Sequence, residues 1–366
     1  MKAEREIEGI AFPFAAGVTA AALSGISPVF INPTCHMLAL GMTALSSILL
    51  YYSSARGWES RIQWLLTALC TLSCGIFIGL CGTEMQISDL PSKGRLAAAA
   101  REMAFAMESA IDSIDFRNEG TGGVIKALLT GNRNGISPET TQAFRDSGAS
   151  HILALSGLHL GIIYVIIARF LSLAGNTRLI RRSRSVAVII LCGLYTMATG
   201  AGASIMRAFI FIVLKEVADM SGRHASLKSI LAASLIIHLT FDPTSIADIG
   251  FQLSYAAIFG IAYIFPYLRN LWQNDWIGLK RIWESAALSI ACQLTTGPLA
   301  YYYFGTFPQY FLLTNLIAVP LAGFMIPAAL LTLSLTSLGC CPDFLITATE
   351  SLVTALTESL KIISTM

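Results

Sequence analysis

The sequence predicts an all-α fold, a polytopic integral membrane helical bundle of about ten or eleven transmembrane segments with a helical extracytoplasmic insertion. Hydrophobic residues make up 55% of the chain and charged residues only 13%, whereas soluble domains contain about 25% charged residues. Apolar runs of about 20 residues, long enough to cross a bilayer as helices, recur along the chain. The net charge of +2 excludes a globally basic nucleic-acid binder, so any polyanion contact must come from local placement of charge.

Candidate crossings occur from the N-terminal region to the C-terminal end. The apolar run from Gly9 is long and more spans follow it, so we read it as a first span rather than a cleavable signal peptide. The crossings are expected to begin near Ile10, His36, Ile62, Ser150, Ser185, Ser204, Ser226, Gly250, Ile282, Tyr310 and Phe344.

Two of these crossings are unusual. The segment from Ser204 is short and follows Gly200 and Gly202, which favours a discontinuous helix. The last segment carries Glu350 and two further charged residues, so it is either a transmembrane or an interfacial helix.

Positive charge alternates along the connections between spans, and Lys and Arg mark the cytoplasmic side. Alternate short connections hold no Lys or Arg. The basic connections contain Lys2, Arg5, Arg56, Arg61, Arg178, Arg181, Arg182, Arg184, Arg223, Lys228, Arg269, Lys280 and Arg281. The pattern predicts a cytoplasmic N-terminus and an extracytoplasmic segment 83–149. The expected division is into N-terminal transmembrane helices 1–82, the extracytoplasmic helical segment 83–149, a second membrane domain 150–340 and a C-terminal transmembrane or interfacial helix 341–366.

The extracytoplasmic segment has a helical period. Apolar residues recur from Gly94 to Asp115 with charged residues off the stripe, so this helix is expected to lie on the membrane or against the bundle. Gly120, Gly122 and Gly123 are expected to break it before a short helix with Lys126 and a glycine-flanked turn, residues 131–135. Ser137 and Pro138 then predict a helix N-terminus.

The cysteines and the absent motifs limit which disulfides, metals and cofactors we expect. Most of the eight cysteines lie in apolar runs and are expected to be small buried hydrophobes. A disulfide between Cys35 and Cys81 remains open, since both are expected near the outer side. The chain holds no GxxxxGK[ST] loop and no HxHxDH cluster, so no ATP-driven engine, metal or other cofactor is expected.

His151, Ser156 and His159 lie in one apolar run and, in a continuous helix, would lie close to one face. Polar residues in such a run point to a lined path. A Ser-His hydrolase is a second interpretation, although it needs an orienting acid and an oxyanion hole, and a helix rather than a strand is expected before Ser156. A third is helix-helix contact through Ser156 and Gly157.

Arg207 lies in an apolar run, where arginine is costly unless it pairs or faces water. Asp242 and Asp248 are candidate partners on a neighbouring connection. The guanidinium is either a structural, salt-bridged group or an attraction point for phosphate at the outer mouth.

The remaining candidates are scattered. Gln252, Gln293 and Asn315 each place an amide in an apolar helix, and together with prolines they favour a bundle with an interior cavity. On the extracytoplasmic segment, Arg133 and Arg145 flank the connection that leads to the histidine helix. Acidic residues are interspersed with the basic ones there, so charge alone predicts no nucleic-acid footprint.

Three ordered stretches between about Leu128 and Leu330 resemble the ComEC competence family, the inner-membrane channel proteins that take up DNA. The first joins the GNRNGIS turn to the SHILALSGLHLG core. The second runs from Arg207 through Asp242-Pro243 to the DIGFQLS element that ends at Ser254. The third runs through Cys292-Gln293, Pro298, Tyr302, Phe304-Gly305, Asn315-Leu316 and Pro320.

The resemblance implies a channel that passes single-stranded DNA inward during natural transformation, and no enzyme. It implies a site lined by Arg133, Arg145, His151, Ser156, Gly157, His159, Arg207, Asp248, Gln252, Gln293 and Asn315. It also implies membrane lipids as surroundings, a DNA-receptor protein and a cytosolic ATPase supplied by other chains, and homo-oligomerisation as an option. The OB-like module and the metallo-β-lactamase-like domain of full-length members are expected to be absent. A membrane hydrolase using Ser156 and His159, and a secondary transporter of a small solute, remain alternatives.

Overall fold

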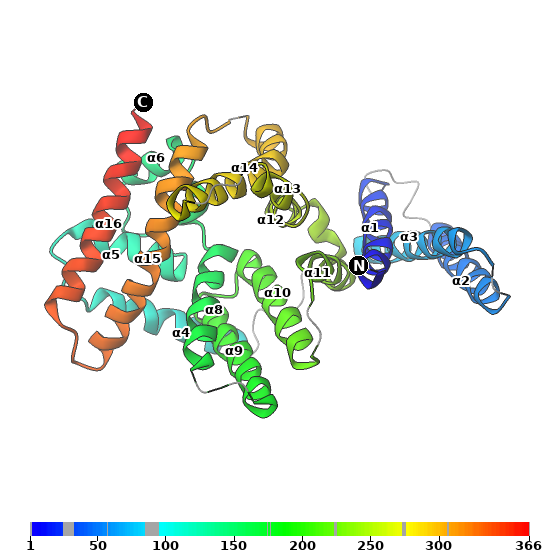
Figure 1. Cartoon of the computed structure of the whole chain (residues 1–366), viewed down its shortest axis with the longest axis horizontal. Helices are drawn as coiled ribbons and strands as arrows, with labels where there is room; N and C mark the ends of the chain where they lie inside the picture. The colour runs from blue at the N-terminus through cyan, green and yellow to red at the C-terminus, as the bar shows by residue number, and fades with distance from the viewer. Residues whose placement is uncertain are drawn as a thin grey trace. The chain divides into compact units, whose positions relative to one another are not determined.

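The computed structural model describes residues 2–24, 33–56, 58–84, 95–173, 175, 177–222, 225–272, 276–305 and 307–365. All elements in these ranges are helices, as expected (Figure 1). They are α1 (Lys2–Ser24), α2 (Pro33–Ala55), α3 (Ser60–Glu84), α4 (Arg95–Asp112), α5 (Glu119–Thr130), α6 (Pro138–Asp146), α7 (Ser150–Leu153), α8 (Gly157–Ser172), α9 (Arg178–Ala198), α10 (Ala203–Met220), α11 (Leu227–Phe241), η3 (Pro243–Ala247), α12 (Ile249–Phe259), η4 (Gly260–Ile264), α13 (Phe265–Asn270), α14 (Ile277–Phe304), α15 (Phe311–Ser337) and α16 (Asp343–Ser364).

A helix occupies each expected crossing. Among the described residues, five helical stretches are long and apolar enough to cross a membrane, namely Glu6–Leu23, Cys35–Ala55, Ser60–Gly82, Ile249–Asn270 and Phe311–Ser337. Two shorter apolar helices, Gly157–Ser172 and Leu227–Phe241, correspond to further expected crossings. The chain is therefore a multi-pass membrane protein, while the full count and the sidedness of the crossings stay predictions.

The chain forms two compact units. One comprises Met1–Ser92 and His224–Ala262, and the other comprises Lys93–Arg223 and Tyr263–Met366. The four-part division of the sequence remains a prediction, because these units describe packing alone.

In the first unit, α1 and α3 pack closely through glycines. A Cβ atom on Gly17 would lie 2.1 Å from the carbonyl oxygen of Leu72, and one on Gly75 would lie 2.1 Å from that of Phe14. Small residues let helix backbones approach in this way when apolar burial cannot drive association. No disulfide joins Cys35 and Cys81.

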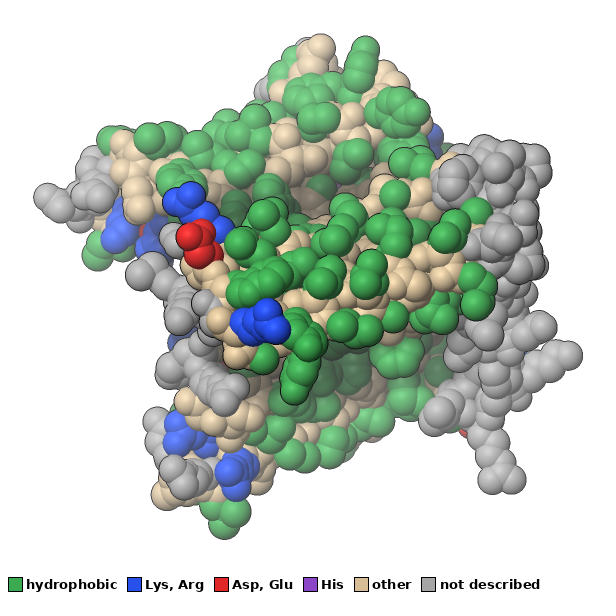
Figure 2. All heavy atoms as spheres, turned by 90° about the vertical axis from the view of Figure 1, so that its right-hand side faces the viewer, with side chains coloured by type: hydrophobic (Ala, Val, Ile, Leu, Met, Phe, Trp, Pro, Cys, Tyr) green, Lys and Arg blue, Asp and Glu red, His purple; other side chains and the backbone are tan. Residues whose placement is uncertain are grey.

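The outward side chains of α2 are those of a lipid-facing helix. Met37 is 69% exposed and Leu38 67%, and further apolar side chains continue along the helix. Figure 2 shows many hydrophobic side chains on the surface and few charged ones among them. A surface of this kind is stable in lipid, not in water.

The second unit encloses the larger core. Residues from α4, α5, α6, α7, α8, α15 and α16 share one buried hydrophobic cluster that includes Ile125, Leu128, Met325 and Leu356. The helix α4 therefore packs against the bundle, one of its two expected placements. The expected break at Gly120, Gly122 and Gly123 is wrong: these glycines lie inside α5, and the connection spans residues 113–118 instead.

Replacing Gly17 by Ala should destabilise the protein by about 1–3 kcal/mol, because the added methyl group meets backbone that cannot move aside easily. The midpoint of thermal unfolding in detergent measures the effect. Gly41→Ala on α2 is the control, since a Cβ there meets no atom within 4 Å. An equal midpoint for both variants would contradict the close α1–α3 contact.

Candidate functional site

The turn at residues 131–135 follows α5 and depends on glycine at both ends. Gly131 has φ +79° and caps α5 by donating its N–H to the carbonyl oxygen of Ala127, and Gly135 has φ +98°. Glycine adopts these left-handed conformations without the strain that a Cβ atom brings. The turn expected from the sequence is confirmed, and Arg133 lies exposed at its centre.

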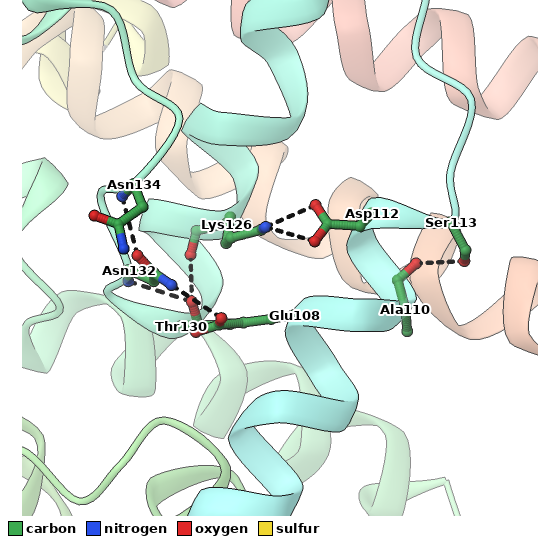
Figure 3. A network of polar contacts seen from close by, with 8 residues as sticks. All are labelled: Glu108, Ala110, Asp112, Ser113, Lys126, Thr130, Asn132 and Asn134. Atoms are coloured by element: carbon green, nitrogen blue, oxygen red, sulfur yellow. Dashed lines mark hydrogen bonds and ion pairs between the residues drawn. The ribbon is translucent and has the colours of Figure 1, made fainter.

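Side chains of α4 hold this turn (Figure 3). The Asn132 Nδ2 donates to Glu108 Oε2 at 2.9 Å, while Asn132 Oδ1 accepts the N–H of Asn134 at 3.0 Å. One turn further along α4, Asp112 pairs with Lys126 of α5 at 2.6 Å. The segment that carries Arg133 is therefore fixed to two helices.

The helix α6 begins as expected, because the Ser137 hydroxyl accepts the N–H of Thr140 at 3.1 Å and Pro138 follows. Arg145 lies exposed in its last turn. Beyond it, the carbonyl oxygen of Ser147 accepts the hydroxyl of Thr314 at 2.7 Å, which fastens this connection to the start of α15.

The predicted continuous helix through His151, Ser156 and His159 is wrong. The helix α7 ends at Leu153, the backbone of Ser156 is extended (φ −131°, ψ 172°), and α8 begins at Gly157. The Ser156 hydroxyl accepts the N–H of Leu158 at 3.3 Å, and His159 Nδ1 accepts the N–H of Ser156 at 3.2 Å. This reciprocal capping box satisfies the freed backbone groups and makes the break stable.

The break gives the two histidines different surroundings. His159 is completely buried, and its Nε2 forms no hydrogen bond to the described residues. His151 is exposed, with Nδ1 3.2 Å from the carbonyl oxygen of Gly148. A common face of one helix therefore does not relate them, and their place along a path remains a prediction.

The helices α8 and α10 start side by side and run parallel. A Cβ atom on Gly157 would lie 3.4 Å from that of Ala208, and further along the Tyr164 hydroxyl donates to Glu216 Oε1 at 2.7 Å. Both N-termini, with their partial positive charge, thus lie at the same end. The connection expected between α9 and α10 lies at residues 199–202, but α10 runs without interruption from Ala203 to Met220, so the discontinuous helix expected from Ser204 is wrong.

Arg207 lies in the second turn of α10 and is 4% exposed. The N-cap residue of this helix is Gly202, which offers no side chain to the first N–H groups. The positive end of α10, the positive end of α8 and a buried guanidinium are thereby gathered in one region. Such an arrangement favours anions.

The sequence did not lead us to a second polar cluster, which lies toward the C-terminal ends of α8 and α10. Glu216 is buried, and besides Tyr164 it lies 3.5 Å from the Nζ of Lys215. Lys215 also pairs with Asp219 at 2.9 Å and lies over the Tyr164 ring. The signal was an acidic residue in an apolar run, which is costly unless paired.

In the first unit, Asp248 and Gln252 serve local structure. Asp248 caps α12 by accepting the N–H of Phe251 at 3.0 Å, and Gln252 Nε2 donates to the carbonyl oxygen of Ile246 at 2.9 Å. Asp242 caps η3 in the same way through the N–H of Ser245. These bonds hold the sharp connection between α11 and α12.

The last two amides lie in the second unit. Gln293 is on α14, where its Nε2 lies 3.4 Å from the position a Cβ of Gly297 would take. Asn315 is near the start of α15, and its buried Oδ1 accepts no hydrogen bond from the described residues. Neither position tests the expected role along a path.

The fold and the site define a polytopic α-helical membrane protein. In it, the N-termini of α8 and α10 and the buried Arg207 form one region of positive charge. The Competence protein family matches residues 128–366, so the chain belongs to this family. This confirms the family resemblance seen in the sequence. No solved structure matches the chain.

Curated relatives align over just over half of the chain. ComE operon protein 3 of Bacillus subtilis (strain 168) is 28% identical over 218 residues, 59% of this chain and 27% of the relative. Competence protein ComA of Neisseria gonorrhoeae is 26% identical over 57% of this chain and 30% of the relative. The uncharacterized protein YcaI of Escherichia coli (strain K12) is 24% identical over 55% of this chain and 27% of the relative. The aligned part is thus a third or less of each relative's length.

Replacing Ser156 by Ala should lower the free energy of unfolding by about 1 kcal/mol, because α8 loses its N-cap acceptor. Ser156→Asp, which keeps an acceptor, should retain most of the stability. Ser183→Ala is the control, since that exposed serine bonds only within its own helix. Thermal unfolding in detergent measures all three, and an unaffected Ser156→Ala would argue against the capped break.

Proposed function

We propose that the chain is a channel component that passes single-stranded DNA across the bacterial inner membrane during natural transformation. Membership in the Competence protein family carries this proposal. The N-termini of α8 and α10 lie at the same end, and the buried Arg207 lies near the N-terminus of α10. Together they supply a region that attracts phosphate. The N-terminus is cytoplasmic and segment 83–149 extracytoplasmic in this proposal, following the distribution of Lys and Arg.

The strand would be received near Arg133, Arg145 and Arg207 and would pass residues of the α7–α8 break. Weak contacts to hydroxyl, imidazole and amide groups suit a conduit, because tight binding would stop transit. Driving force and strand delivery would come from other chains, a cytosolic ATPase and a DNA receptor. Homo-oligomerisation is compatible with this scheme.

Arg207→Ala and His159→Leu should each abolish DNA uptake while leaving the protein in the membrane. The first removes the buried cation, and the second removes the imidazole that caps α8. Uptake of labelled DNA, divided by the amount of membrane protein, measures the effect. Arg181→Ala, an exposed arginine on α9, is the control. Normal uptake by both site variants would remove these residues from the mechanism.

One contact favours testing a second function, a membrane hydrolase. The Ser156 hydroxyl oxygen lies 3.1 Å from His159 Nδ1. The capping box accounts for this contact, and His159 Nε2 has no hydrogen-bonded acid among the described residues to orient it.

A serine-reactive phosphonate probe should therefore leave Ser156 unlabelled. The measurement is probe incorporation in purified protein, compared with Ser156→Ala. Labelling of the native protein that disappears in the variant would establish a nucleophilic serine and overturn the non-enzymatic assignment.

A further inference from the structure

The carboxylate of Glu350 on α16 is buried, only 6% exposed, in a helix at the other end of the chain from the segment it binds. It accepts hydrogen bonds from the backbone N–H groups of Arg117 and Asn118, the latter at 3.2 Å. Asn118 is the N-cap residue of α5, and its own side chain makes no capping bond. Glu350 therefore binds, from a distant helix, the N–H of the N-cap residue of α5 and that of the residue before it.

The helix α5 runs from an exposed start into the bundle. Val124, Ile125, Leu128 and Leu129 are each at most 3% exposed. They share one cluster with residues from the middle of the membrane-spanning helix α15. Arg117, Asn118 and Gly120 are exposed, so the bonds to Glu350 join the exposed start of α5 to the packed helix α16.

The rest of α16 holds the same region. Val353, Leu356 and Leu360 belong to the cluster that contains α5, and Lys361 lies 3.5 Å from Glu139 of α6. The hydroxyls of Thr349 and Thr332 lie 3.0 Å apart, which joins α16 to α15 next to Glu350. The last helix thus contacts both helices that flank the turn carrying Arg133.

We propose that Glu350 is a positioning residue, and that its buried carboxylate fastens the start of α5 so that the 131–135 turn and the α7–α8 break are held for transport. The transport part of this inference rests on the proposed function. The fastening itself rests on the contacts alone. A negative charge at a helix N-terminus is favourable for electrostatic reasons as well.

The two parts are tested by separate measurements on the full chain. Hydrogen-deuterium exchange in detergent reports on residues 113–130, and labelled-DNA uptake per molecule of membrane protein reports on transport. The variants are Glu350→Gln, which keeps an acceptor without charge, and Glu350→Leu, which keeps the volume without an acceptor. Glu358→Leu is the control, because that carboxylate is 58% exposed on the same helix.

We expect exchange in residues 113–130 to be about tenfold faster in Glu350→Leu, since the N–H groups of Arg117 and Asn118 lose their acceptor and the start of α5 loses its attachment to α16. Glu350→Gln should be intermediate and Glu358→Leu unchanged. DNA uptake should fall in the same order. A side chain that merely filled a space in the apolar core would give the opposite order, because leucine would be tolerated best there.

Two results would overturn the proposal. Unchanged exchange in Glu350→Leu would show that the carboxylate does not fasten α5. Faster exchange with normal uptake would show that fastening does not matter for transport. If the native chain takes up no DNA while exchange still follows the expected order, the proposed function fails and the fastening role stands.

Discussion

The structure depends on one constraint: backbone N–H and C=O groups that are buried away from water need hydrogen-bond partners within the protein. A membrane interior offers no water to bond the N–H groups of a helix that begins inside it. Side chains bind backbone N–H groups at two helix starts of the second unit. Ser156 and His159 cap α8 from within its own sequence, whereas Glu350 of α16 accepts the N–H of Asn118, the N-cap residue of α5. The breaks are stable because these acceptors are present.

Much of the architecture was predictable because its signals are local. Apolar run length predicted where helices occur, and every expected start position lies within a helix or at its edge. Glycine and proline predicted the turn at residues 131–135, the start of α6 and the gap between α9 and α10. These residues act through their own backbone conformations, so neighbouring sequence is sufficient to interpret them.

The α7–α8 break was not predictable in the same way. The sequence LALSG contains no proline, and a serine followed three residues later by histidine departs from the usual Ser-x-x-Glu capping pattern. The apolar periodicity continues across the break and predicts one helix. Likewise, the role of Glu350 depends on a contact across more than two hundred residues. Its charge left a transmembrane and an interfacial helix open, and only the packing shows that the side chain is buried.

The charge distribution along α10 connects the site with passage of an anion. Arg207 lies near the positive end of the helix dipole, and Glu216 and Asp219 lie near its negative end. Side chains and backbone therefore reinforce each other at both ends. A phosphate would be attracted by the end of α10 that carries Arg207 and repelled by the end that carries Glu216 and Asp219. In the proposed function, this helix therefore favours capture of the strand at one end and does not bind it along its whole length. Lys215 pairs with both carboxylates and so partly neutralises the negative charge at that end of the helix.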